Sequence, residues 1–232
     1  MNTNTLQTYT HNILGIGLSL GLAYYGFFTP NPNFTSPTKA AISTSSSSFD
    51  IGLLNNVDNE MNQDHVEKIF QKHLRGSAKK KAKALAAHLM FLSTHYKISP
   101  AFILAVIQAE SSFKIHAKSS AGAIGLMQVL PPTAKYITKK RKLSHYRTAQ
   151  DLRNPFVNLS VGVSYLSYLR SRFSHSMYYV AAYNLGPTTV NKMLKKNAFK
   201  LGKVDKYVND IHRTTKNLRK EYISQRFLAS AN

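Results

Sequence analysis

The chain has 232 residues, of which 43% are hydrophobic, so it can bury the core of one domain of ordinary size together with flanking segments. It contains no cysteine, which excludes a disulfide framework, a thiol nucleophile and a cysteine-based metal site. The formal net charge of +21 predicts a polyanionic partner, which can be nucleic acid, anionic lipid or an anionic cell-wall polymer.

The first part of the chain is apolar and carries almost no charge. Residues 13–28, ILGIGLSLGLAYYGFF, would span roughly 24 Å as a helix, which is shorter than a full bilayer crossing of about 20 residues. This length is typical of the apolar region of a signal peptide or of a short anchor. We therefore expect residues 1–28 to act as a signal peptide or membrane anchor, although no basic residue precedes the apolar stretch.

Residues 29–64 are rich in Ser, Thr, Pro and Asn. Such a composition cannot bury enough apolar surface to offset the entropy lost on ordering, so we expect a disordered linker. The charge also changes here, because residues 1–64 hold one Lys and four acidic residues, whereas the rest of the chain holds 30 basic and six acidic ones.

From residue 65 onwards the hydrophobic positions follow a helical period. Ser99 is a good helix cap and Pro100 suits a first helical position, while Gly186 followed by Pro187 marks a helix end. We find no alternating strand pattern of useful length, so the sequence predicts a mainly α-helical domain over residues 65–224 and a tail over residues 225–232. Helices are expected over residues 65–74, 79–96, 99–113, 154–173, 176–185, 187–196 and 202–223.

Glu110 ends the most apolar of these helices, and it is the only Glu between residues 68 and 220. It continues a stripe formed by Ile103, Val106 and Ile107, at helical spacing. Burial disfavours the charged carboxylate, and an acid still protonated near neutral pH can serve as a general acid. From position alone, Glu110 can equally be a helix-end residue in water or a buried acid paired with a Lys or Arg.

The segment that follows contains two glycines three residues apart, Gly122 and Gly125. Glycines at this spacing permit a tight backbone or the close approach of a ligand, and an ordinary turn is the alternative. No Gly-Lys-Ser or Gly-Lys-Thr follows, which argues against a phosphate loop.

Four segments now occur in a characteristic order: ESSF, AKSSAGAIGLMQVLPPTA, NLSVGVSYL and AAYNLGP. In this order and spacing, from roughly residue 83 to residue 208, the chain resembles the soluble lytic transglycosylase (SLT) family of peptidoglycan-cleaving enzymes. Each motif alone is weakly specific, whereas the series is highly specific. The resemblance implies a lysozyme-like helical catalytic domain of the goose-lysozyme type, with a substrate groove.

The resemblance also implies a role for each matched position. Glu110 corresponds to the catalytic acid, Ser111 to a polar residue that helps to position the reacting sugar, and Tyr207 to a tyrosine near the catalytic carboxyl group. Asn158 and Gly162 match a helix motif whose expected role is packing. The groove is expected to be lined by Gly125, by Met127 under a sugar face, by Gln128 as a hydrogen-bonding residue, and by Tyr183 and Asn184 on the opposite wall.

In this family a single Glu carries the chemistry. The resemblance implies that Glu110 protonates the oxygen between N-acetylmuramic acid and N-acetylglucosamine, and then takes the proton of the muramic C6 hydroxyl as that oxygen attacks C1. A 1,6-anhydro sugar results. The other acids of the region, Asp151, Asp205 and Asp210, lie outside the groove motifs, and we expect no cofactor and no metal. A muramidase that uses water and a non-catalytic wall-binding or assembly protein remain as alternatives.

The chain departs from the family near Tyr207. The family often has Glu-Thr beginning four residues before this tyrosine, where Lys203 and Val204 stand here. We expect this departure to affect product binding and substrate preference more than the reaction itself.

The expected partner is the peptidoglycan glycan strand, met in the periplasm or elsewhere in the envelope. The basic surface could contact anionic envelope polymers, and residues 13–28 could associate with a membrane. The basic run KKRK at residues 139–142 falls between the motifs, and a solvated loop is its simplest interpretation. Specific binding of nucleic acid is not expected, because the sequence shows no known nucleic-acid-reading module.

Overall fold

The computed structural model describes residues 61–197, 199 and 202–230, so the apolar segment over residues 1–28 and most of the expected linker lie outside the described residues. The described part is helical, and its only β-structure is a pair of isolated bridges, Lys118 with Ile124 and Ile124 with Val129. This confirms the mainly α fold class. The α-helices are α3 (Gln63–His73), α4 (Ala82–Tyr96), α5 (Pro100–Ser111), α6 (Pro131–Arg141), α7 (Pro155–Arg172), α8 (Ser176–Leu185), α9 (Pro187–Lys195) and α10 (Gly202–Ser230), and the 3-10 helices are η1 (Gly76–Lys81) and η2 (Ala149–Arg153).

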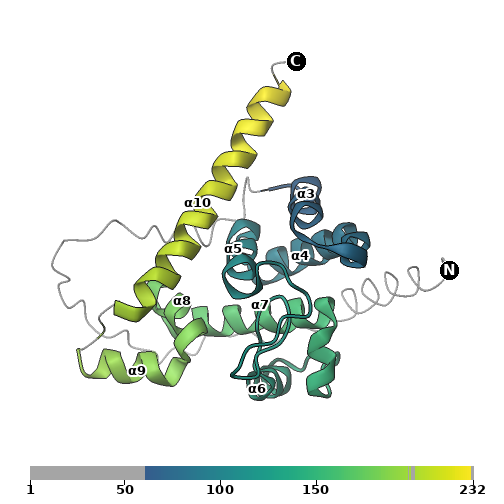
Figure 1. Cartoon of the computed structure of the whole chain (residues 1–232). Helices are drawn as coiled ribbons and strands as arrows, with labels where there is room; N and C mark the ends of the chain where they lie inside the picture. Colours follow the sequence, from purple (N-terminus) through teal and green to yellow (C-terminus); the bar gives the residue numbers. More distant parts are fainter. Residues whose placement is uncertain (1–60, 198, 200–201, 231–232) are drawn as a thin grey trace, which may run out of the picture. The chain divides into compact units, whose positions relative to one another are not determined.

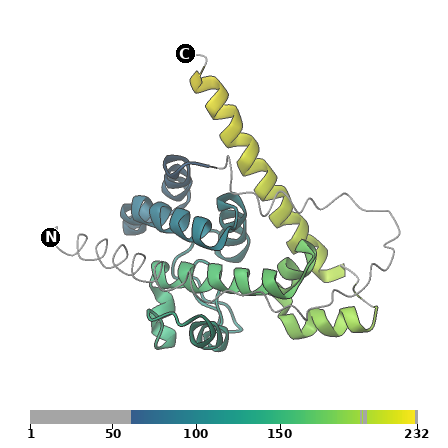
Figure 2. The same cartoon turned by 180° about the vertical axis from the view of Figure 1, so that it is seen from behind.

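Helix α7 runs through the middle of the helical domain. It packs against α4 on one side and α6 on another, and α8 follows it and packs back on it (Figure 1). Helix α5 packs mainly on α10, which also contacts α8 (Figure 2). Helix α10, the last of the described helices, therefore covers the helix that carries Glu110.

Helix α5 is the core helix of the domain, and its start is the one predicted. The Ser99 side chain accepts a hydrogen bond from the Phe102 N–H, and Pro100 occupies the first turn. Every residue from 100 to 107 is buried. Full burial of each large side chain here, such as Phe102 or Ile103, contributes about 1.5–3 kcal/mol.

The ends of the helical region differ from the expected boundaries. Helix α3 begins at Gln63, Asn62 caps it, and Met61 is already buried, so the core begins before residue 65. At the other end α10 continues to Ser230, through the segment expected to be a tail. The helix expected to open with the lysines over residues 79–81 begins only at Ala82. These lysines lie in η1 instead, in agreement with the unfavourable effect of cations in the first turn of an α-helix.

The basic run over residues 139–142 is helical rather than a loop. Pro131 and Pro132 open α6, and the run forms its last turn and its cap, Lys142 with a φ of 54°. Cations at this end interact favourably with the helix dipole. The simplest sequence interpretation, a solvated loop, was therefore wrong, although Lys139 and Lys140 are exposed.

No single helix of the described part is long and apolar enough to cross a bilayer. One bent pair, residues 76–96 together with α5, has the length and the apolar composition of a membrane-crossing segment, by these two criteria alone.

Candidate active site

Glu110 lies in the last turn of α5, where this buried helix reaches the surface, and its side chain is only partly exposed. Burial raises the pKa of the Glu110 carboxyl group from 4.5 to about 7. A hydrogen bond from Tyr207 acts in the opposite direction and lowers the pKa, but burial outweighs it. The Glu110 carboxyl group can therefore both hold and release a proton near neutral pH. A group that acts first as an acid and then as a base needs this property.

Tyr207 on α10 is the direct partner of this carboxyl group. Its hydroxyl donates a hydrogen bond of 2.5 Å to Oε1 of Glu110, across 97 residues of sequence. Burial, followed by the charge of Glu110 and this hydrogen bond, raises the pKa of Tyr207 well above its ordinary value. The phenol consequently stays protonated and remains a donor whichever state Glu110 adopts.

After α5 the chain turns sharply into a loop that contains the other predicted residues. Ser112 and Phe113 both have positive φ values, 48° and 63°, and then the Gly125 N–H donates to the carbonyl oxygen of Ala117 at 2.8 Å. Gln128 also has a positive φ, 45°, and its N–H and its Nε2 both donate to the carbonyl oxygen of Gly125, at 3.1 and 3.0 Å. The GLMQ segment is thus a tight turn that fixes the Gln128 side chain.

The side chain of Asn158 on α7 holds this turn from beneath. Its Oδ1 accepts from the Met127 N–H at 2.8 Å, and its Nδ2 donates to the carbonyl oxygens of Ile124 and Leu152 at 2.7 and 3.0 Å. Because Asn158 is fully buried, these three bonds replace all contact with water at that point. The sequence comparison with the family predicted only packing for Asn158.

Glycines make this close approach possible. A Cβ atom at Gly125 would lie 2.4 Å from Nδ2 of Asn158, and the φ of Gly125 is +79°. A Cβ at Gly162 would lie 2.4 Å from Sδ of Met127, so α7 needs a glycine where Met127 packs on it. The packing role expected for Gly162 agrees with this contact.

Tyr183 on α8 closes the site from another side. Its hydroxyl donates a 2.9 Å hydrogen bond to the carbonyl oxygen of Met127. Burial and then the charge of Glu110 raise the pKa of Tyr183 well above its ordinary value, so this phenol stays protonated and keeps its hydrogen bond to the turn. Asn184, the next residue, is exposed and free to meet a ligand.

Two of the predicted residues do not face a ligand in the way expected. Met127 is 0% exposed and packs on Gly162, so its side chain lies beneath the turn and offers no surface to a sugar. Ser111 is also buried, and its hydroxyl donates to the carbonyl oxygens of Leu126 at 2.7 Å and Ile107 at 3.2 Å. Both residues hold the turn in place beside Glu110.

Other acidic groups of this region are engaged elsewhere. Asp151 accepts hydrogen bonds from the N–H groups of Arg147 and Thr148, and Asp210 pairs with Lys206 and Arg213 at 2.6 Å each.

Asp205 lies on α10 with its Oδ1 buried and without a hydrogen-bond partner among the described residues. None of these aspartates is among the groups that shift the pKa of Glu110. Within the described residues no group of three His, Asp or Glu side chains is placed to hold a metal ion.

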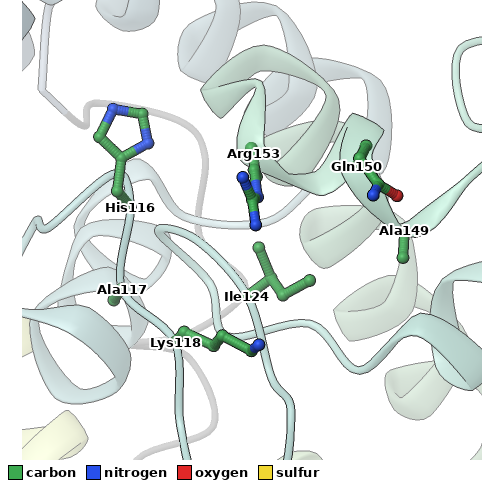
Figure 3. A pocket seen from close by; sticks show the side chains of 7 residues that line it. All are labelled: His116, Ala117, Lys118, Ile124, Ala149, Gln150 and Arg153. Carbon is green, nitrogen blue, oxygen red and sulfur yellow. The ribbon is translucent and has the colours of Figure 1, made fainter.

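A separate pocket of about 430 Å³ lies next to the same loop. Figure 3 shows Arg153 extending from η2 towards Ile124, while His116 and Lys118 come from the chain after α5. None of the predicted site residues lines this pocket, so the candidate active site is defined by the contacts of Glu110 and not by this cavity.

Residues 90–205, half of the chain, match the family described as the transglycosylase SLT domain. The chain belongs to this family. The matched segment of this SLT domain contains Glu110, the GLMQ turn, Asn158 and Tyr183, and ends two residues before Tyr207.

Curated relatives of the SLT domain carry related names. It is 36% identical over 109 residues to a soluble lytic murein transglycosylase of Salmonella typhimurium, covering 47% of this chain and 16% of that protein. It is 38% identical over 104 residues to a membrane-bound lytic murein transglycosylase C of Histophilus somni, covering 41% of this chain and 29% of that protein. The chain thus spans less than a third of the length of these relatives.

A solved structure agrees with the fold. The crystal structure of the 70 kDa soluble lytic transglycosylase of Escherichia coli matches 68% of this chain and 29% of its own, with a TM-score of 0.52 and 22% sequence identity. This likeness confirms the expected lysozyme-like fold of the SLT domain.

Proposed function

We propose that this chain is a peptidoglycan lytic transglycosylase in which Glu110 is the single acid and base. The observation that supports the proposal most directly is the Glu110 carboxyl group, whose pKa is raised to about 7 and which is bound by Tyr207 at the end of a buried helix. The family membership and the names of the relatives support the same substrate class.

In the proposed reaction, protonated Glu110 gives its proton to the oxygen between C1 of N-acetylmuramic acid and the next N-acetylglucosamine. The C1–O bond breaks and the N-acetylglucosamine leaves with a new 4-hydroxyl group. The Glu110 carboxylate then takes the proton of the muramic C6 hydroxyl while O6 bonds to C1. Glu110 ends protonated, no water is consumed, and the product carries a 1,6-anhydro ring.

The protein's own groups would support these steps at the carboxyl group. Tyr207 donates to Oε1 and so stabilises the carboxylate that forms after the first proton transfer. The substrate's N-acetyl group can stabilise the positive charge at C1, which removes the need for the second carboxylate of ordinary glycosidases. We assign sugar contacts to Gln128 and Asn184, which are accessible, whereas Ser111 and Met127 support the turn.

Digestion of isolated peptidoglycan in water enriched in ¹⁸O tests the proposal. We expect products with 1,6-anhydromuramic ends and without ¹⁸O, as measured by mass spectrometry. Reducing ends that carry ¹⁸O would instead show the alternative, a hydrolytic muramidase of the same fold. A hydrolytic muramidase digest serves as the positive control for ¹⁸O incorporation.

The variant Glu110→Gln decides between an enzyme and a non-catalytic wall-binding or assembly protein. We expect it to release no products while still binding peptidoglycan. Product release at the wild-type rate would exclude Glu110 as the acid, and absence of release by the wild-type protein would favour the binding protein. A basic nucleic-acid binder predicts tight DNA binding and no effect on peptidoglycan.

We further propose that the protein works in the envelope, in the periplasm or bound to a membrane. The names of the soluble and membrane-bound relatives and the apolar residues 13–28 support this location. The basic residues would then bring the enzyme to anionic envelope polymers, in addition to the glycan strand.

A further inference from the structure

A cluster of two tyrosines and two cations lies where α6 packs on α7. The Tyr136 hydroxyl donates to the Tyr168 hydroxyl at 3.1 Å, and Nη1 of Arg172 donates to the same oxygen at 3.0 Å. Nζ of Lys140 lies 5.8 Å from the ring centroid of Tyr136 and 5.4 Å from that of Tyr168. We call these four residues the tyrosine–cation cluster.

The hydrogen bonds of the cluster leave one phenolic proton unused. Two phenols bring two O–H protons, and the bond between Tyr136 and Tyr168 uses one of them. The guanidinium group of Arg172 donates hydrogen bonds and accepts none, so it cannot be the acceptor for the second phenolic O–H. Among the described residues no other acceptor bonds to either hydroxyl, so one phenolic O–H remains available to an acceptor from outside.

The charges around the cluster are positive. Burial raises the pKa of Tyr168, but the hydrogen bonds from Tyr136 and Arg172 and the charges of Arg172 and Lys140 outweigh burial and lower the pKa overall. No carboxylate is among the groups that act on this phenol. Neither Lys140 nor Arg172 forms an ion pair among the described residues. A free O–H donor beside two such cations is an arrangement that favours an anion.

The cluster is open to solvent on its outer side. Tyr136 is 48% exposed, and Lys140 and Arg172 are exposed as well, whereas Tyr168 is 8% exposed and forms the floor. The hydrogen bonds to Tyr168 fix the Tyr136 ring and the Arg172 guanidinium group in place. A ligand would therefore meet donors that are already oriented.

A row of rings joins the cluster to the candidate active site. The Tyr168 ring stacks on Tyr165 with centroids 6.3 Å apart and an interplanar angle of 18°, and Tyr165 lies 5.4 Å from Tyr183. Tyr183 in turn bonds to the carbonyl oxygen of Met127. The cluster and the turn beside Glu110 are thus joined by a series of side-chain contacts along α7. Figure 1 shows helix α7 between α6 and α8.

We propose that the tyrosine–cation cluster binds a carboxylate of the peptide that branches from a muramic acid residue of the glycan strand. This inference rests on the proposed function, which makes peptidoglycan the substrate. The guanidinium group of Arg172, the ammonium group of Lys140 and the free phenolic O–H supply three donors for two carboxylate oxygens. The cluster would select strands that retain their peptides over strands that have lost them.

The test compares two ligands and two pairs of substitutions in the non-cleaving Glu110→Gln protein. The ligands are glycan strands with intact peptides and the same strands after an amidase has removed the peptides. Lys140→Gln with Arg172→Gln removes both cations of the cluster, and Lys139→Gln with Arg147→Gln removes two exposed charges outside it. Tyr168→Phe removes one hydroxyl and keeps the ring.

We expect the cluster pair to lose about tenfold in affinity for the peptide-bearing strands and to bind the stripped strands unchanged. Tyr168→Phe should lose less, again only with the peptide-bearing strands. The control pair should bind both ligands like the parent protein. Equal losses with both ligands, or equal losses by the two pairs, would overturn the proposal in favour of general electrostatic attraction.

Failure of the proposed function gives a different result. The wild-type protein would then release no products from peptidoglycan at all, whatever happens at the cluster. Cleavage by the wild-type protein together with unchanged strand binding by the cluster pair would remove only this inference.

Discussion

At the scale of the residue, the carboxyl group of Glu110 is controlled by two opposing effects. Burial raises its pKa and the hydrogen bond from Tyr207 lowers it, and the balance lies at about 7. Tyr207 therefore holds the pKa of Glu110 below the value that burial alone would give. Tyr207 thus positions the Glu110 carboxyl group and also tunes its pKa.

Replacing Tyr207 by Phe should move the pH dependence of the reaction upwards. In the proposed reaction the protonated form of Glu110 starts the cleavage, so activity is expected to fall as the pH rises through its pKa. Without the hydrogen bond to the carboxylate this pKa rises further, and we expect the alkaline limb of kcat/KM to shift up by about one pH unit. Initial rates of product release from peptidoglycan over a pH series give the limb, with Tyr222→Phe on the same helix as the control. A shift to lower pH would contradict the assigned role.

Replacing Glu110 by Gln should stabilise the fold at alkaline pH. The pKa of Glu110 is about 7 in the folded chain, above the value of 4.5 expected when unfolded, so the folded state loses stability as the pH rises from 4.5 to 7. Gln carries no charge and escapes this loss. At pH 8 we expect the free energy of unfolding of the variant to exceed that of the wild-type protein by about 1–3 kcal/mol.

Urea unfolding at pH 4 and pH 8 measures this difference. The gain should be absent at pH 4, where the side chain is protonated in both states. An equal gain at both pH values would mean that the substitution acts through packing and not through charge.

At the scale of the element, helix α7 determines the shape of the loop beside Glu110. Asn158 makes three hydrogen bonds to the backbone of that loop and η2, and Gly162 leaves room for Met127. These contacts with the turn are made only when α7 is in place. The loop's position is a property of the packed helices and not of the loop sequence alone.

Asn158→Ala should destabilise the domain by about 2–4 kcal/mol, because it leaves the buried Met127 N–H and two buried carbonyl oxygens without their partner. We expect the loss in urea unfolding at neutral pH. Asn209→Ala, at an exposed position of α10, is the matched control and should change stability by less than about 0.5 kcal/mol. A loss below about 1 kcal/mol for Asn158→Ala would show that water replaces its side chain at low cost.

Much of the element order could be predicted from the sequence, because its signals are local. The cap at Ser99, the boundary at Gly186 and the apolar stripe that ends at Glu110 all appear in the structure. The resemblance to the family also predicted that Tyr207 lies near Glu110, although 97 residues separate them.

The inward direction of Ser111 and Met127 could not be predicted in this way. It depends on the left-handed backbone of Ser112, Phe113 and Gln128, none of which is glycine. Residues other than glycine adopt this conformation mainly where surrounding contacts enforce it, and beside Gln128 the Asn158 side chain supplies such a contact from another helix by accepting from the Met127 N–H. Motif position indicated which residues gather at the site, but not which of them face a ligand.

At the scale of the whole molecule, the positive charge lies on the same part of the chain as the SLT domain. Only one of the 31 Lys and Arg residues precedes residue 65. Four acidic residues lie between residue 90 and residue 210. Two of them, Asp151 and Asp210, already interact with neighbouring groups and so do little to neutralise the positive charge of the surface.

Binding of the Glu110→Gln protein to whole peptidoglycan should therefore weaken steeply as salt is added. Screening shortens the range of surface charges from ~10 Å at 0.1 M to ~3 Å at 1 M ionic strength, and most of the attraction to a polyanion lies outside the shorter range. Sedimentation of the protein with peptidoglycan over a salt series measures the bound fraction. A neutral N-acetylglucosamine oligomer has no charge for the basic surface to attract, so its binding should be independent of salt. Salt-independent binding of peptidoglycan would show that the basic surface does not face the polymer.

The hydrogen bond between Tyr207 and Glu110 also ties catalysis to the order of synthesis. Ribosomes make α5 before α10, which is the last of the described helices, and Tyr207 reaches Glu110 only after α10 has packed on α5. Until then the carboxyl group lacks its donor and the buried face of α5 lacks its cover. The proposed enzyme would thus stay incomplete while these helices are still being made, and would become competent when α10 docks on α5.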